Sequence, residues 1–123
     1  MVTIEEVEEM LDEIAMTLPQ EFYYKLNGGI LLLPEVKKDK EAKRNDLYIM
    51  GEYHHERHLG RYIIIFYGSF MEVYGYLPKE KLYEKLKSTL IHEFTHHIES
   101  LAGDHSLAEK DRREMEEYKR KWS

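Results

Sequence analysis

The chain contains no cysteine among its 123 residues. This absence excludes disulfides, iron–sulfur clusters and zinc sites built on thiolates, so any metal site must use histidine and carboxylate ligands. Uninterrupted apolar runs of ~20 residues are also missing, so we expect no membrane-spanning helix. The first residues form neither a basic nor an apolar segment. We therefore expect no signal peptide and a cytoplasmic protein.

Positive charge is in shorter supply than negative charge. The chain has 18 Lys and Arg against 24 Asp and Glu, a net charge of −6, which argues against a nucleic-acid partner or an anionic membrane surface. Hydrophobic residues make up 42% of the chain and ten residues are tyrosine, which indicates a folded core. We expect one domain over residues 1–123 and a monomer.

Periodicity and turn signals predict an α+β fold. Apolar residues recur at helical spacing after Thr3, which forms a capping-box pattern with Glu6. Pro78 and Gly103 are placed to begin and end a long helix. The predicted elements are helices over residues 3–17, 78–103 and 106–121, strands over residues 30–33, 46–53 and 60–67, a turn or strand end at 68–70, and a solvated, mobile loop over 35–45.

The long helix carries the motif H-E-x-x-H as His92-Glu93-Phe94-Thr95-His96. On an α-helix, residues four apart leave the same face about 6 Å apart along the axis. Two imidazoles so placed can bind one cation, and zinc accepts neutral histidine nitrogens. Glu93, between them, is placed to act on a metal-bound water as a general base. No charged residue occupies the other positions from Thr89 to Ile98, which is typical of a buried metal helix.

A helical wheel separates two faces of this segment. The histidines and Glu99 lie opposite a continuous apolar stripe, and His97 lies on the core side, where we expect a buried, hydrogen-bonded side chain. The stripe consists of Leu82, Leu86, Leu90, Phe94, Ile98 and Leu101. Lys81 and Lys85 share the histidine face, so the wheel alone fits a plain solvated face as well.

Two histidines leave a catalytic zinc site one protein ligand short. From the residues alone, the candidates for a third ligand are Glu99, Asp104, His105 and Asp111. A separate cluster, His54, His55 and His58, falls between two predicted strands. The cluster could form a second metal site, but we interpret it as a loop that binds no metal; a third possibility is that it overhangs the cleft and contacts a substrate.

These features resemble the minimal zincin-like metallopeptidases, small single-domain proteins long classed as a domain of unknown function. The resemblance rests on the helix that ends at Leu18-Pro19, the strand around Gly51-Glu52-Tyr53, and the histidine motif followed by Asp104 and Leu107. It implies a zincin-like fold with an N-terminal helix, a small, mostly antiparallel sheet of three to four strands, the long motif helix and a C-terminal helix. It also implies His92, His96 and Asp104 as zinc ligands and Glu93 as the base. The segment between His97 and Asp104 is about two residues longer than in the family, which keeps Glu99 and Asp111 as alternatives.

The expected function is zinc-dependent hydrolysis of peptide bonds in a peptide or protein substrate. The substrate would pair in extended form with the second or third strand, and a tyrosine such as Tyr53, Tyr67 or Tyr74 could assist the oxyanion. Another divalent cation could replace zinc in a site of two histidines and a carboxylate. The alternative is a non-catalytic binding module whose metal is structural.

Overall fold

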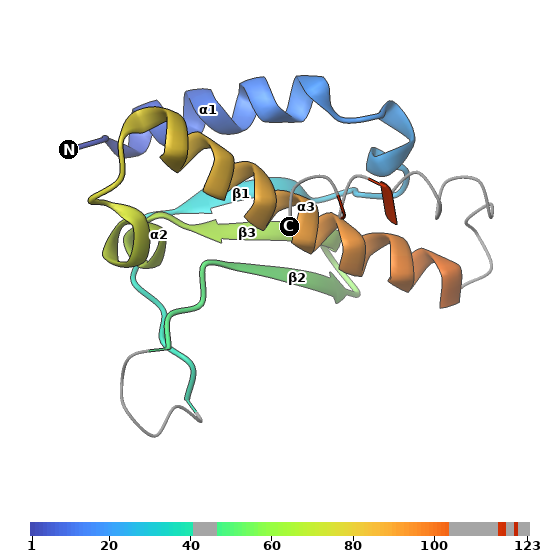
Figure 1. Cartoon of the computed structure of the whole chain (residues 1–123). Helices are drawn as coiled ribbons and strands as arrows, with labels where there is room; N and C mark the ends of the chain where they lie inside the picture. The colour runs from blue at the N-terminus through green and yellow to red at the C-terminus, as the bar shows by residue number, and fades with distance from the viewer. Residues whose placement is uncertain (41–46, 104–115, 118–119, 121–123) are drawn as a thin grey trace.

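A computed structural model describes residues 1–40, 47–103, 116–117 and 120. Over these residues the chain is an α+β protein with three α-helices and a small mixed sheet of three strands (Figure 1). In chain order the elements are α1 (Ile4–Thr17), the 3₁₀ helix η1 (Gln20–Tyr23), β1 (Gly29–Leu33), β2 (Gly51–Glu56), β3 (Gly60–Phe66), α2 (Tyr67–Tyr74) and α3 (Lys79–Gly103). Of the predicted C-terminal helix over 106–121, the structure describes residues 116, 117 and 120, which are helical, whereas Asp104, His105 and Asp111 lie outside the described residues.

The sheet has the order β1-β3-β2. β3 is the central strand and pairs in parallel with β1 and antiparallel with β2. The expectation of a mostly antiparallel sheet was therefore wrong, because a chain that leaves β1 and returns through the β2–β3 hairpin brings β3 beside β1 in the same direction. It also follows that β2, and not β3, is an edge strand beside α3.

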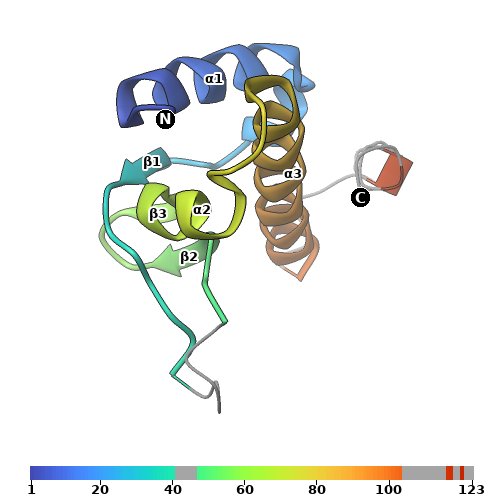
Figure 2. The ribbon, with the colours of Figure 1, turned by 60° about the vertical axis from the view of Figure 1, so that its left-hand side comes forward.

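Both long helices pack on one side of the sheet (Figure 2). α3 lies against β2 and β3, and α1 lies against α3 and over β1. The apolar stripe of α3 is buried as predicted, with Leu82, Leu86, Leu90, Phe94 and Leu101 all at 0% exposure. Alternate residues of β3, such as Ile63 and Ile65, point to the same face of the sheet and complete this core. The fold therefore anchors one face of α3 and leaves the histidine face at the β2 edge.

Local signals predicted some boundaries and missed others. The capping box between Thr3 and Glu6 is formed, and α1 ends before Pro19. The second strand was predicted over 46–53, but β2 begins at Gly51 and continues through His54 and His55. The turn or strand end predicted at 68–70 is wrong, because these residues lie in α2, which follows β3 without a loop. Gly68 suits that helix, since a Cβ there would lie 2.7 Å from the Glu35 carbonyl carbon.

The segment predicted as a solvated loop is partly anchored. Ile49 N–H donates to the Lys37 carbonyl at 2.8 Å and Asp39 N–H to that of Leu47 at 2.9 Å. Ser69 on α2 accepts a hydrogen bond from Lys37 N–H at 2.6 Å. The chain therefore enters β2 from a fixed direction. Separately, no described helix is both long enough and apolar enough to cross a membrane.

Candidate metal and peptide groove

A groove runs between the edge strand β2 and the exposed face of α3. Two contiguous cavities form it, of about 710 and 390 Å³, and both are lined by Gly51, His92 and Glu93. One end is additionally lined by Tyr48, Ile49 and Met50, and the other by Glu52, His54, His96, Glu99 and Ser100. The predicted motif therefore lies on the floor of a groove whose other wall is a strand edge.

His92 and His96 face one another one turn apart on α3. Their Nε2 atoms are 3.2 Å apart, and their rings are nearly perpendicular. Two nitrogens bound to one tetrahedral ion at ~2.0–2.1 Å would be about 3.3 Å apart, so this spacing fits a shared cation. Without a cation, one Nε2–H could instead donate a hydrogen bond to the other nitrogen.

Glu99 approaches the opposite nitrogen of His96. Its Oε2 lies 3.9 Å from His96 Nδ1, on the side of the ring away from His92. This distance is too long for a hydrogen bond, and a closer approach would be needed for the carboxylate to orient a metal-binding imidazole and increase its basicity. The arrangement gives Glu99 the position of a partner to the ligand, which counts against it as the third ligand. Asp104 and Asp111 lie outside the described residues, among which no group of three metal-binding side chains occurs.

Glu93 is buried, in contrast to the histidines on either side. It is 6% exposed, and burial, together with the negative charge of Glu52, raises its pKa to about 7. Gly51 makes room for it, because a Cβ at Gly51 would lie 3.2 Å from both Cγ and Oε2 of Glu93. The carboxylate is thus held against the β2 backbone, where it can exchange a proton near neutral pH.

His97 has the buried, hydrogen-bonded role that the wheel predicted. It is fully buried, and burial lowers its pKa to about 4, so the ring is neutral. Its Nε2 lies 2.8 Å from the Tyr24 carbonyl oxygen, which can only accept, so Nε2 carries the proton. Nδ1 therefore accepts the hydrogen bond from the Tyr53 hydroxyl at 2.9 Å. This bond ties β2 to α3 directly beside the groove.

The three tyrosines proposed for the oxyanion have other partners. The Tyr53 hydroxyl donates to His97, and the Tyr67 hydroxyl donates to the Val2 carbonyl at 2.6 Å. The Tyr74 ring packs on Phe70, and neither Tyr67 nor Tyr74 is among the residues that line the groove. The geometry supports none of them as an oxyanion donor.

The histidine cluster is not the loop that we predicted. His54 and His55 belong to β2, and His58 lies in the turn that follows. His54 Nε2 is 3.0 Å from Glu52 Oε1, and its ring stacks on Tyr62. Lys37 Nζ is 2.7 Å from the other Glu52 oxygen. Burial alone would raise the Glu52 pKa, but hydrogen bonds from Lys37 and His54 lower it. His54 thus lines the same end of the groove as His92 and His96, where its Nε2 contacts Glu52.

Sequence reasoning missed Gly51, Glu52 and the Tyr24 carbonyl as parts of this site. Each is far from the motif in the chain and reaches it only through the pairing of β2 with β3 or the packing of η1 on α3. Phe22 and Tyr23 anchor η1 to Phe94, with ring centroids 6.1 and 5.1 Å apart.

Comparison with solved structures places the chain in a family. No family model matches the sequence, and no curated protein matches it. A conserved hypothetical protein from Thermus thermophilus is 31% identical, with a TM-score of 0.74, and the match covers 83% of this chain and 99% of that one. The chain therefore belongs to the same family as this protein.

Proposed function

We propose that the protein is a metal-dependent peptidase of the minimal zincin-like kind. The observation that carries this proposal is the pair of imidazole nitrogens 3.2 Å apart on the floor of a groove, with a buried carboxylate between their residues. His92 and His96 would hold zinc or another divalent cation, with Asp104 as third ligand and Asp111 as the alternative. The cation would supply Lewis acidity, lowering the pKa of water and polarising a carbonyl.

The side chains around the pair have separate roles in this proposal. Glu99, 3.9 Å from His96 Nδ1, would move closer and orient the ring when a cation is bound. Glu93 accepts a proton from the attacking water and returns it to the leaving amine. A cation held by the histidines would lower the raised pKa of Glu93 and favour the charged form that a base requires. His97 and Tyr53 fix the distance between the base and the strand edge.

The substrate we propose is an extended peptide that pairs with β2 by strand addition. β2 has only β3 as a partner among the described strands. Ile49 and Met50 make one end of the groove apolar. Glu99 makes the other end acidic, where the Glu52 oxygens already contact Lys37 and His54. We therefore expect preferred peptides to carry apolar residues on one side of the cleaved bond and a basic residue on the other.

The test combines zinc titration with hydrolysis of a mixed peptide pool read by mass spectrometry. We expect Glu93→Gln to keep zinc and lose hydrolysis, and His92→Ala or His96→Ala to weaken zinc binding by more than about 100-fold, beyond the usual effect of an outer-sphere partner. His55→Ala, which removes an exposed imidazole on β2, is the matched control and should leave both properties unchanged. Loss of zinc from Glu93→Gln would overturn the assignment of the base.

A structural metal in a non-catalytic module is the competing function. A structural zinc site contributes folding energy, so chelation would unfold the protein. We expect instead that the chelated protein stays folded, because the core stripe of α3 is buried independently of the histidine face. Thermal unfolding with and without a chelator distinguishes the two functions.

A further inference from the structure

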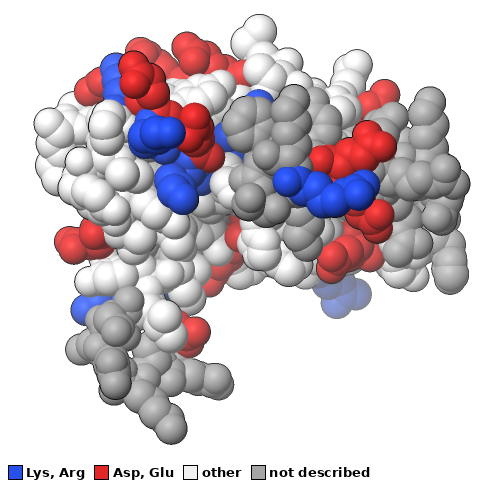
Figure 3. Space-filling model, in the orientation of Figure 1, with Lys and Arg blue, Asp and Glu red and all other residues white. Residues whose placement is uncertain are grey.

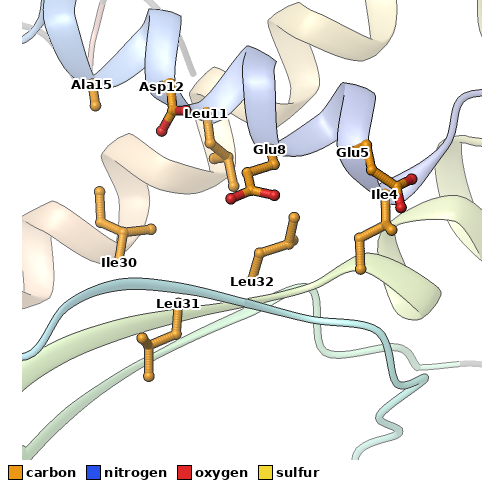
Figure 4. Close-up of a pocket in the computed structure, with 9 residues that line it drawn as sticks. All are labelled: Ile4, Glu5, Glu8, Leu11, Asp12, Ala15, Ile30, Leu31 and Leu32. Atoms are coloured by element: carbon orange, nitrogen blue, oxygen red, sulfur yellow. The ribbon is translucent and has the colours of Figure 1, made fainter.

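A second groove lies at the opposite edge of the sheet, between α1 and β1 (Figure 4). Its volume is about 310 Å³. Ile30 and Leu32 point from β1 toward α1, and Leu11 points down from the helix to meet them (Figure 4). Glu5, Glu8 and Asp12 line the α1 side. This groove is separate from the one that holds the histidine pair.

The strand beneath this groove has an open edge. β1 pairs with β3 and with no other described strand. Proteins usually protect such edges with lysine, proline or a bulge, but the β1 sequence is Gly-Ile-Leu-Leu-Leu. Leu31 points away from α1 (Figure 4) and is 39% exposed. An edge with unpaired backbone groups and an exposed leucine is suited to receive another strand.

Every charged side chain among the described residues that line this groove is acidic. Glu5, Glu8 and Asp12 are exposed, take part in none of the ion pairs among the described residues, and have no lysine or arginine beside them in the groove. The other carboxylates of α1 differ, because Glu6 binds Lys79 at 2.8 Å and Glu9 and Glu13 also act on that lysine. In Figure 3, acidic groups follow α1 along the upper margin, with basic groups beside them near the start of α3.

We propose that the β1 edge binds an extended segment of a partner protein that carries lysine or arginine at alternate positions. The segment would add to the sheet beside β1. Its basic side chains would lie over the apolar floor and reach the three carboxylates, and its intervening side chains would lie beside Leu31. Glu5 and Asp12 are seven helical steps apart, about 10 Å along the axis. Alternate residues of an added strand are ~6.6 Å apart, so two basic side chains are enough to reach the three carboxylates.

Charge argues against a second copy of this chain as the occupant. Pairing two β1 edges would bring the carboxylate rows of two α1 helices to the same junction, where like charges repel. The site is also independent of the proposed peptidase activity, because it shares no lining residue with the β2 groove.

The experiment uses the isotopically labelled, metal-free full chain and a synthetic peptide of alternating lysine and valine, followed by NMR titration. We expect shifts at β1 and α1 and affinity that falls with salt. Glu8→Gln with Asp12→Asn should weaken binding at least 10-fold. Glu9→Gln with Glu13→Gln, which removes the same charge from the other side of α1, should change it less than 2-fold.

Two further peptides test the mode of binding. A glutamate–valine peptide should not bind, and a lysine–valine peptide N-methylated on alternate residues should bind at least 10-fold more weakly, because it cannot complete the strand. Equal weakening by the two double variants, shifts confined to the β2 groove, or no binding at millimolar peptide would each overturn the proposal. So would concentration-dependent dimerisation of the chain through β1.

Discussion

The two edges of the sheet begin in the same way and differ in what surrounds them. β1 begins at Gly29 and β2 at Gly51, and each edge strand shares a groove with a helix. At β1 the glycine has a positive φ of 71°, and a Cβ there would meet nothing within 4 Å. At β2 the glycine is needed for space, because Glu93 packs against it. Gly29 therefore permits a left-handed backbone conformation, and Gly51 leaves room for the buried Glu93 side chain.

The charged groups follow the same division. The three carboxylates over β1 are exposed, whereas Glu93 in the β2 groove is buried and its pKa is raised to about 7. Burial is what separates a surface able to attract a basic partner from a group able to move a proton. This difference in burial fits the two proposals, binding of a basic segment at the β1 edge and chemistry at the β2 edge.

The largest effect that we expect is on the pH dependence of the free energy of unfolding, and it would sharpen the contrast between the two edges. Because the folded pKa of Glu93 lies above its ordinary value, the folded state holds the proton more tightly, and stability falls as pH rises from about 4.5 to 7. Glu93→Gln should therefore stabilise the metal-free protein at pH 8, by up to about 3 kcal/mol, and not at pH 4. His97 acts oppositely, since its lowered pKa makes stability fall as pH drops from 6.5 to about 4.

Denaturant unfolding of the metal-free protein from pH 4 to 8 measures how stability changes with pH through Glu93 and through His97. In Glu93→Gln we expect stability to rise up to about pH 6.5 and then to stay level. Asp12→Asn at the β1 edge is the control and should change stability by less than about 0.5 kcal/mol. A Glu93→Gln protein less stable than wild type at pH 8 would show that the acid is not strained by its burial.

The second effect concerns the two glycines. Gly51→Ala should destabilise the fold by about 2 kcal/mol, because the added methyl group overpacks the Glu93 side chain. In a Glu93→Ala background most of that cost should disappear. Gly29→Ala should cost about 1 kcal/mol through backbone strain, and Glu93→Ala should not change that cost. Chemical denaturation is measured on the wild type, on Glu93→Ala, and on each glycine variant with and without Glu93→Ala. If Gly51→Ala costs the same in both backgrounds, Gly51 and Glu93 are not in contact.

The smallest effect is at the link between β2 and α3. Tyr53→Phe removes the hydroxyl that donates to buried His97 Nδ1 and should cost about 1–2 kcal/mol. Tyr48→Phe removes a hydroxyl near the same groove without touching His97 and should cost less than 0.5 kcal/mol, roughly the usual surface value. Thermal unfolding distinguishes them, and similar melting temperatures would show that the link does not tie the strand to the helix.

Local sequence signals predicted the elements better than their connections. The stripe from Leu82 to Leu101 fixes one face of α3, and the capping box at Thr3 marks the start of α1. α2 was missed because Gly68 and Ser69 have the composition of a turn, whereas packing against the chain near Glu35 holds them in a helix. The parallel pairing of β1 with β3 depends on contacts about 33 residues apart, which no local pattern encodes.

The same limit applies to the candidate site. The spacing of His92 and His96 placed two imidazoles together, and the wheel placed His97 in the core. The raised pKa of Glu93 depends on Gly51 and Glu52, some 40 residues earlier in the chain, so it needed the fold. The identity of a third metal ligand stays a prediction.

The position of β2 at the sheet margin bears on how occupancy of its groove can be observed. A strand that is hydrogen-bonded to a neighbour on one side only opens locally more readily than the central strand, and its amides exchange hydrogen for deuterium sooner. A peptide lying along it would slow that exchange from Gly51 to Glu56, while β3 would change little. Deuterium uptake can therefore report a bound peptide even where no bond is cleaved.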